Sequence, residues 1–153
     1  MKKWVIPLIC FMMMTTGGCQ GKAGDGPSAP EEAKPAVKSW QVSFEHHNVN
    51  SRIPDKIAAA AERNKSGETA SLLEDGGFWV LVTRGVKPTG GYSVRVTNIL
   101  LEETGDRSKL VVCYKYQDPR PDQFVTQVLT TPMEIIRLTG VKKRPDEVVF
   151  KQE

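Results

Sequence analysis

Runs of β-branched and aromatic residues, several of them alternating with polar residues, recur along the chain from residue 39 to residue 153. Such residues suit a pleated, half-buried surface, and a side-chain period of two is typical of a β-strand. Residues 68–73 fit either a short strand or a turn. The clearest strand patterns lie in residues 40–44, 78–84, 92–100, 107–117, 124–130, 133–138 and 147–151. The pattern therefore predicts six or seven short strands.

The central pair of these runs, residues 78–84 and 92–100, flanks a segment made almost entirely of turn-forming residues. Gly90 and Gly91 in that segment can adopt positive φ without steric cost, so the chain can reverse its direction there. The sequence therefore predicts a β-hairpin whose glycine-rich tip is residues 85–91.

One segment, residues 53–63, has the composition of an α-helix rather than of a strand. Pro54 suits the first helical turn, and Asp55 is favourable at the positive end of the helix dipole. Four consecutive alanines follow Ile57, and alanine has the highest helix propensity. Because Ile53 and Ile57 share one face of the predicted helix, we expect that face to pack on a sheet.

A compact antiparallel β-sandwich or half-barrel, mainly β in class and with one short helix, fits this set of elements. Residues 39–153 provide a chain length that is common for a single domain, and they contain no internal repeat. We therefore predict one β-rich domain of six to seven strands over residues 39–153.

The first residues have the order of a secretory signal, with basic Lys2 and Lys3 followed by an apolar run and then by small residues. The apolar run is shorter than the about 20 residues that a membrane-spanning helix needs. We therefore assign residues 1–18 to a signal peptide. Residues 19–38 are rich in Gly, Pro, Ala, Ser, Glu and Lys, and they lack the apolar side chains that would offset the entropy of ordering. They are predicted to form a disordered tether.

Cys19 directly follows Gly18, and small residues before a cysteine resemble a bacterial lipobox, whose cysteine is acylated. Thr16 departs from that pattern, because leucine is usual three places before the cysteine. Several acyl chains make membrane anchoring durable. We therefore expect an exported protein that is lipid-anchored at Cys19 in the bacterial cell envelope. Gln20, in place of aspartate, resembles the sorting signal for the outer membrane of a diderm host. The alternative is an exported protein that is cut nearby and carries no anchor.

Charge and cysteine content argue against two further classes of protein. The formal net charge of +3 falls to about +1 when Lys2 and Lys3 leave with the signal, so nothing favours binding to nucleic acid. With Cys10 removed and Cys19 acylated, Cys113 has no partner for a disulfide. Because Cys113 lies in an apolar strand pattern, we predict that it is a small buried residue of the core.

No residue pattern indicates catalysis, a metal site or a cofactor site. His46 and His47 are adjacent, so in a strand they would point to opposite faces, and we place them in a solvated loop. Glu74 and Asp75 lack the further spaced acids of a calcium-binding loop, which predicts an exposed turn. Ser93 lacks the glycine two residues later that a nucleophile elbow requires. We therefore expect a protein that is not an enzyme and that binds no metal and no cofactor.

The tip of the predicted hairpin also carries a family resemblance. Residues 85–94, Gly-Val-Lys-Pro-Thr-Gly-Gly-Tyr-Ser-Val, resemble the signature of the PrcB C-terminal domain family. Residues 110–112 and 126–138, with Thr-Thr-Pro at 130–132, resemble the rest of that pattern. The resemblance covers about residues 78–139, and its most specific part is Lys-Pro-Thr-Gly-Gly-Tyr, because a hairpin requires none of its Lys, Thr and Tyr.

The family is named after a lipoprotein subunit of a surface protease complex. The resemblance therefore implies a non-enzymatic envelope protein that binds and stabilises a partner protein, with a surface protease as the candidate, and it supplies no catalytic residues. Loops held by a rigid scaffold commonly carry binding function. The expected partner-binding residues are Lys87, Pro88, Thr89, Gly90, Gly91 and Tyr92, with Lys87 and Thr89 standing exposed.

Two alternatives stay open at the level of the sequence. The first is that the glycine-rich segment serves only as a turn. The second is a small-ligand or cell-wall-glycan binding lipoprotein, in which Trp79, Tyr92 or Tyr116 would act as a stacking surface. A pocket with an exposed tryptophan would favour this second alternative.

Overall fold

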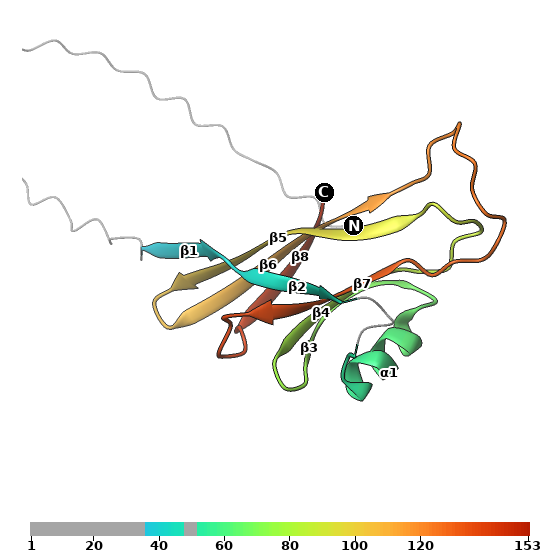
Figure 1. The fold of residues 1–153 in the computed structure, drawn as a ribbon. Helices are drawn as coiled ribbons and strands as arrows, with labels where there is room; N and C mark the ends of the chain where they lie inside the picture. The colour runs from blue at the N-terminus through green and yellow to red at the C-terminus, as the bar shows by residue number, and fades with distance from the viewer. Residues whose placement is uncertain (1–35, 48–51) are drawn as a thin grey trace, which may run out of the picture. The chain divides into compact units, whose positions relative to one another are not determined.

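The structure is a computed structural model, and it describes residues 36–47 and 52–153 (Figure 1). Eight β-strands in two sheets of four, together with one α-helix, α1 (Asp55–Asn64), make up this part of the chain. The predicted signal peptide, Cys19 and residues 20–35 of the predicted tether lie outside the described residues. Within the described residues, no helix is long and apolar enough to cross a membrane.

The first sheet is built around a long antiparallel hairpin. In order across this sheet, the strands are β1 (Val37–Gln41), β5 (Ser93–Thr104), β6 (Arg107–Gln117) and β8 (Glu147–Gln152). β5 and β6 form the hairpin, whose turn contains Gly105 at a φ of +61°. The edge strand β1 pairs with β5 in the antiparallel sense, whereas β8 pairs with β6 in parallel.

The second sheet is antiparallel throughout. In order across it, the strands are β2 (Ser43–His47), β7 (Met133–Thr139), β4 (Phe78–Arg84) and β3 (Glu68–Glu74). β3 and β4 form a tight hairpin, and both glycines of its turn, Gly76 and Gly77, have positive φ. The acidic turn predicted after Glu74 is therefore confirmed, and residues 68–73 belong to a strand rather than to a turn.

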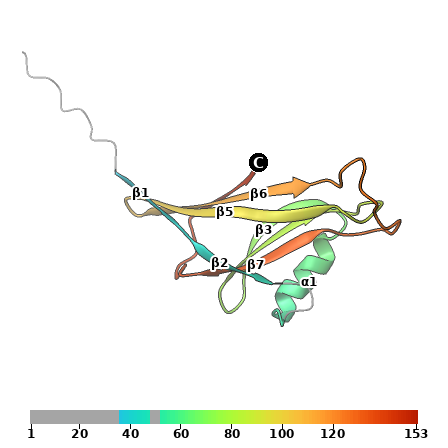
Figure 2. The same ribbon diagram turned by 45° about the horizontal axis from the view of Figure 1, so that its top comes forward.

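The main hydrophobic core lies between the two sheets, which face each other in Figure 2. β4 contributes Phe78, Val80 and Val82 to this core, and side chains from β5, β6 and β7 pack against them. Stacked sheets of this kind bury the alternate residues that point inward from each strand. The predicted fold class is therefore confirmed, since the domain is mostly β, has one short helix and is close to a β-sandwich.

Helix α1 covers the outer face of the second sheet, as the sequence predicts (Figures 1 and 2). Its Ile57, Ala60 and Ala61 pack on Trp79 and Leu81 of β4. β4 is thus covered on both faces, by the main core on one side and by the helix on the other. This explains why every residue of β4 is buried.

The predicted hairpin over residues 78–100 is wrong, because β4 and β5 lie in different sheets and do not pair. β4 already has β3 on one side and β7 on the other, so neither of its edges is free to accept β5. Residues 85–92 therefore carry the chain from one sheet to the other. The glycines permit this change of direction as well as they would permit a hairpin turn.

The single strand predicted over residues 40–44 is also divided between the two sheets. β1 ends at Gln41 and pairs with β5, whereas β2 begins at Ser43 and pairs with β7. The buried residue Val42 lies at the change of sheet. His46 and His47 consequently lie within β2 and not in the loop that the sequence predicts.

Two smaller expectations are corrected as well. Residues 124–130 form an irregular loop, in which Thr130 makes an isolated bridge to Lys87, and not a strand. Cys113 is a free cysteine of β6, but it is half-buried and not enclosed in the core. It faces away from the main core, because its strand neighbour Val112 faces inward.

Candidate functional site

The segment at residues 85–92 packs along a second loop, residues 118–132, which connects β6 to β7. We call this pair of segments the double loop, and it lies at the end of the domain where β4 ends and β5 begins (Figure 1). Lys87 and Thr130 exchange two backbone hydrogen bonds, with N···O distances of 2.8 and 3.0 Å. The Thr130 hydroxyl donates to the Thr89 carbonyl at 2.7 Å, and the Gly90 N–H donates to the Thr126 carbonyl at 2.9 Å. Each segment thus fixes the backbone of the other.

Gly90 and Gly91 are required by the close approach of these two segments. A Cβ atom at Gly90 would lie 2.5 Å from the Thr126 hydroxyl oxygen. A Cβ atom at Gly91 would lie 2.8 Å from Pro119 and 2.9 Å from Val125, and Gly91 also has a φ of +87°. Residues that have a Cβ atom rarely adopt that φ, so both the backbone conformation and the neighbouring atoms favour glycine at position 91.

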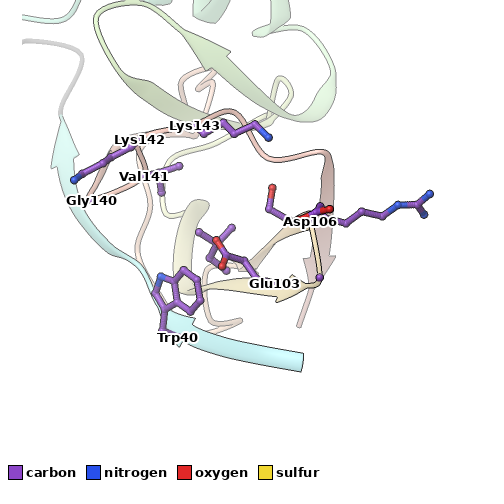
Figure 3. A pocket seen from close by; sticks show the side chains of 11 residues that line it. Trp40, Glu103, Asp106, Gly140, Val141, Lys142 and Lys143 are labelled. Atoms are coloured by element: carbon purple, nitrogen blue, oxygen red, sulfur yellow. The ribbon is translucent and has the colours of Figure 1, made fainter. Parts of the chain in front are cut away.

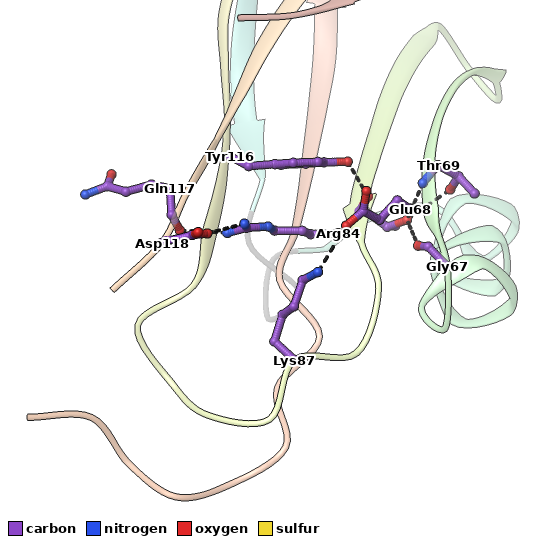
Figure 4. Close-up of polar contacts among 9 residues, drawn as sticks. Gly67, Glu68, Thr69, Arg84, Lys87, Tyr116, Gln117 and Asp118 are labelled. Atoms are coloured by element: carbon purple, nitrogen blue, oxygen red, sulfur yellow. Dashed lines mark hydrogen bonds and ion pairs between the residues drawn. The ribbon is translucent and has the colours of Figure 1, made fainter. Parts of the chain in front are cut away.

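Arg84, the last residue of β4, braces the base of the double loop (Figure 4). Its guanidinium donates to the Gln117 carbonyl at 2.8 Å and forms an ion pair with Asp118. It also lies between two tyrosine rings, 5.0 Å from the ring centroid of Tyr92 and 4.9 Å from that of Tyr116. Cation–π contacts of this length are favourable, more so when the cation is buried, as Arg84 is.

Lys87 and Thr89 are more enclosed than the sequence suggests. The Lys87 ammonium pairs with Glu68 of β3 at 3.0 Å, and its side chain is only 22% exposed (Figure 4). Thr89 is half-buried, and its carbonyl accepts the Thr130 hydroxyl. Tyr92 is half-buried against Arg84, so only Pro88 and Gly91 of the predicted partner-binding residues are exposed. These residues shape the double loop more than they present polar groups to solvent.

Large apolar side chains project from the double loop into solvent. The part of the chain that the structure describes has six exposed large hydrophobic residues, and four of them lie here. They are Val86, Phe124, Val128 and Leu129. Phe124 is fully exposed and Leu129 is 72% exposed. Phe124, Val128 and Leu129 are not predicted as site residues, because residues 124–130 have a strand-like pattern in which apolar side chains would point into the core.

The hydroxyl of Tyr116 faces the same brace and donates to the Thr83 carbonyl at 3.1 Å. Burial, followed by the smaller effects of Tyr114 and Glu68, raises the pKa of Tyr116 from 10.0 to about 12, and nearby Arg84 offsets only part of this rise. Burial removes the water that would stabilise the phenolate, and a phenolate could not donate the hydrogen bond to the Thr83 carbonyl. The neutral phenol is therefore the form that fits this position.

A Tyr116→Phe variant is expected to reduce the loss of stability at alkaline pH. Because the pKa is higher in the folded state, the unfolded state loses the Tyr116 proton first as pH rises above 10.0. The contribution of Tyr116 to the free energy of unfolding is therefore fully present below pH 10.0, and it is lost as the pH rises to about 12. Urea unfolding at about pH 9, about pH 10.5 and about pH 11.5 measures the difference. Identical pH dependence in the two proteins would contradict this assignment.

The two histidines have different neighbours, and neither belongs to a metal-ligand group among the described residues. His46 Nδ1 lies 2.7 Å from Glu134, whose carboxylate also accepts the backbone N–H of Val96. His47 contacts the Trp79 ring, with centroids 5.0 Å apart. Among residues 36–47 and 52–153, no group of three or more His, Cys, Asp and Glu side chains is placed to hold a metal ion.

The comparison with protein families identifies the region that contains the double loop. Residues 79–139 match the family described as PrcB C-terminal, from the second residue of β4 to the last residue of β7. A search of curated proteins and a search of solved structures each found no match. The resemblance inferred from the sequence is confirmed, because residues 79–139 of this chain match the PrcB C-terminal family.

Proposed function

We propose that this chain is a non-enzymatic lipoprotein of the bacterial envelope whose double loop binds and stabilises a partner protein. A surface protease is the first candidate partner, because the family is named after an accessory subunit of a protease complex. The export signal and the acylation of Cys19 are the parts of this proposal that rest on the sequence alone. The binding role has a structural observation in its support.

That observation is a fixed loop pair that exposes apolar side chains. Contiguous exposed apolar surface is a common mark of a protein-binding site. Aromatic residues are enriched at the centres of such sites, and Phe124 is the fully exposed aromatic residue of the double loop. A surface that is ordered before binding loses less conformational entropy when the partner docks. The hydrogen bonds between Lys87 and Thr130 and the brace at Arg84 supply that order.

The family match supports the same location for the binding surface. It spans both segments of the double loop together with the strands that flank them, and it leaves out β1, β2, α1, β3 and β8. The most specific part of the resemblance, Lys-Pro-Thr-Gly-Gly-Tyr, has a structural role in this proposal. Its glycines let the two segments approach, and its Tyr92 holds Arg84 in place.

A double variant, Phe124→Ser with Leu129→Ser, is expected to reduce partner binding by about 30-fold or more, which corresponds to about 2 kcal/mol for the loss of a central apolar contact. Its folding should be unchanged, because both side chains are exposed and neither belongs to the core. The measurement is in-cell crosslinking in the envelope of the native host, followed by affinity capture and mass spectrometry.

The matched control is Val37→Ser, which removes an exposed apolar side chain from β1. A protease recovered in stoichiometric amount with the wild type and the control, but lost with the double variant, would support the proposal. The absence of any protease with the wild type, or equal recovery with all three proteins, would reject it.

A further inference from the structure

A cavity of about 340 Å³ lies at the other end of the first sheet from the double loop (Figure 3). It is formed where β1, the turn between β5 and β6, and the turn between β7 and β8 come together. Trp40 stands at one wall, and Lys142 and Lys143 come from the β7–β8 turn opposite (Figure 3). Glu103, Asp106 and Arg107 complete its charged lining.

Trp40 is the tryptophan that a ligand can reach in the described domain. Its side chain is 42% exposed, whereas Trp79 is buried beneath helix α1. Tyr92 and Tyr116, which the sequence also suggests as stacking surfaces, lie against Arg84. The stacking surface of this domain is therefore Trp40 and none of the three aromatic residues that were expected.

The charged side chains around the cavity are not used in ion pairs within the described part of the chain. No oppositely charged group of residues 36–47 and 52–153 forms an ion pair with Glu103, Asp106, Arg107, Lys142 or Lys143. Other charged residues near these turns do pair, as Arg144 does with Glu74 of β3 and Lys109 of β6 with Glu147 of β8. Carboxylates and cations that line the cavity with Trp40 are thus available to a ligand.

We propose that this cavity is a binding site for a glycan that carries carboxylate groups. The face of an indole ring is electron-rich, and it attracts the weakly positive C–H groups on the flat side of a sugar ring. Carboxylates such as Glu103 and Asp106 accept hydrogen bonds from sugar hydroxyls, and ammonium groups such as Lys142 and Lys143 bind the acidic substituent. A pocket with one aromatic wall and a few convergent polar groups has the usual form of a small-ligand site.

This site is separate from the double loop, so a glycan and a protein partner can be bound together. β5 begins directly after Tyr92 and ends at Thr104 beside the cavity, a strand of 12 residues. Twelve residues of β-strand span roughly 35–40 Å, which places the two sites at opposite ends of that strand. Loss of one binding activity by mutation should therefore leave the other intact.

The test is a titration of the full-length chain in detergent micelles, followed by NMR of the tryptophan indole signals and of the backbone amide signals of residues 103–107 and 140–143, which also report binding in variants that lack Trp40. The acidic probe is the disaccharide of N-acetylglucosamine and N-acetylmuramic acid, and the neutral probe is N,N′-diacetylchitobiose, which lacks the carboxylate. We expect the acidic sugar to shift the Trp40 indole signal with a Kd on the order of 1 mM or tighter, and the neutral sugar to bind more weakly. Trp40→Ala should weaken both by about tenfold or more, whereas Trp40→Phe, which keeps an aromatic face, should retain most of the affinity.

A charge variant separates the carboxylate contact from ring stacking. Lys142→Ala with Lys143→Ala should remove the preference for the acidic sugar and leave the neutral sugar unaffected. The control is Lys115→Ala with Lys151→Ala, which removes two exposed cations that do not line the cavity. Unchanged binding to Trp40→Ala, or no shift of the Trp40 signal with either sugar, would overturn the proposal. A shift with short-chain phosphatidylglycerol alone would overturn it too, and would make the cavity a lipid-headgroup site.

Discussion

Substitution of Gly91 by valine is expected to lower the free energy of unfolding by roughly 3 kcal/mol or more. Two costs add at this position. A β-branched residue at a φ of +87° is strained, and its Cβ would lie 2.8 Å from Pro119 and 2.9 Å from Val125. Because native domains have only about 5–15 kcal/mol of stability, urea unfolding should show a clear drop in the transition midpoint.

Gly105 provides the control that separates the two costs. It also has positive φ, at +61°, but no atom lies within 4 Å of the position that its Cβ would take. Gly105→Val should therefore introduce backbone strain alone and lower the free energy of unfolding by about 1–2 kcal/mol. Equal losses in the two variants would mean that the contact between residues 85–92 and residues 118–132 adds nothing to stability.

The elements that the sequence predicts well are those specified by their own residues. Helix α1 begins at Asp55, and an acidic residue in the first turn is favourable at the positive end of the helix dipole. Pro54 precedes the helix as its N-cap and does not lie in the first turn as predicted. β6 covers residues 107–117 as predicted, since a continuous run of apolar residues at 110–114 is bounded by polar and charged residues. Pro132 lies directly before β7, where a proline does not remove a ladder hydrogen bond.

The pairing of strands depends on distant residues, and local pattern did not reveal it. The run of turn-forming residues after Arg84 is compatible with a hairpin and with a passage between sheets. The choice is made by β3 and β7, which occupy both edges of β4. In the same way, nothing local to Val42 indicates that the strands on its two sides belong to different sheets.

The sequence predicts where the candidate site lies but not which of its side chains are exposed. The Lys-Pro-Thr-Gly-Gly-Tyr segment was identified, yet its Lys87 and Thr89 are held by Glu68 and Thr130. The exposed side chains of Phe124 and Leu129 were overlooked, because an apolar residue in a strand-like pattern is normally assigned to the core. Their exposure follows from the two hydrogen-bonded loops, and that arrangement is a tertiary property.

Replacement of Arg84 by alanine is expected to cost about 2–4 kcal/mol, because it removes a buried side chain, its hydrogen bond to Gln117 and its contacts with two tyrosine rings. The effect should extend beyond global stability. Without the contacts of Arg84, residues 85–92 and 118–132 should open locally more often. Their amide protons should therefore exchange faster by a larger factor than those of the core strands, whose exchange reports the loss of global stability. Urea unfolding and hydrogen exchange followed by mass spectrometry measure the two effects.

The appropriate control is Asp118→Asn, since it removes the ion pair and leaves Arg84 between the tyrosine rings. The Asp118 side chain is 68% exposed, so its pairing with Arg84 is screened by water and should contribute no more than about 1 kcal/mol. Arg84→Ala should therefore be much more destabilising than Asp118→Asn, and only Arg84→Ala should accelerate exchange in residues 85–92. If the two variants were equally destabilising, the ion pair would be the main contact, and the packing of Arg84 between Tyr92 and Tyr116 would not be what orders the double loop.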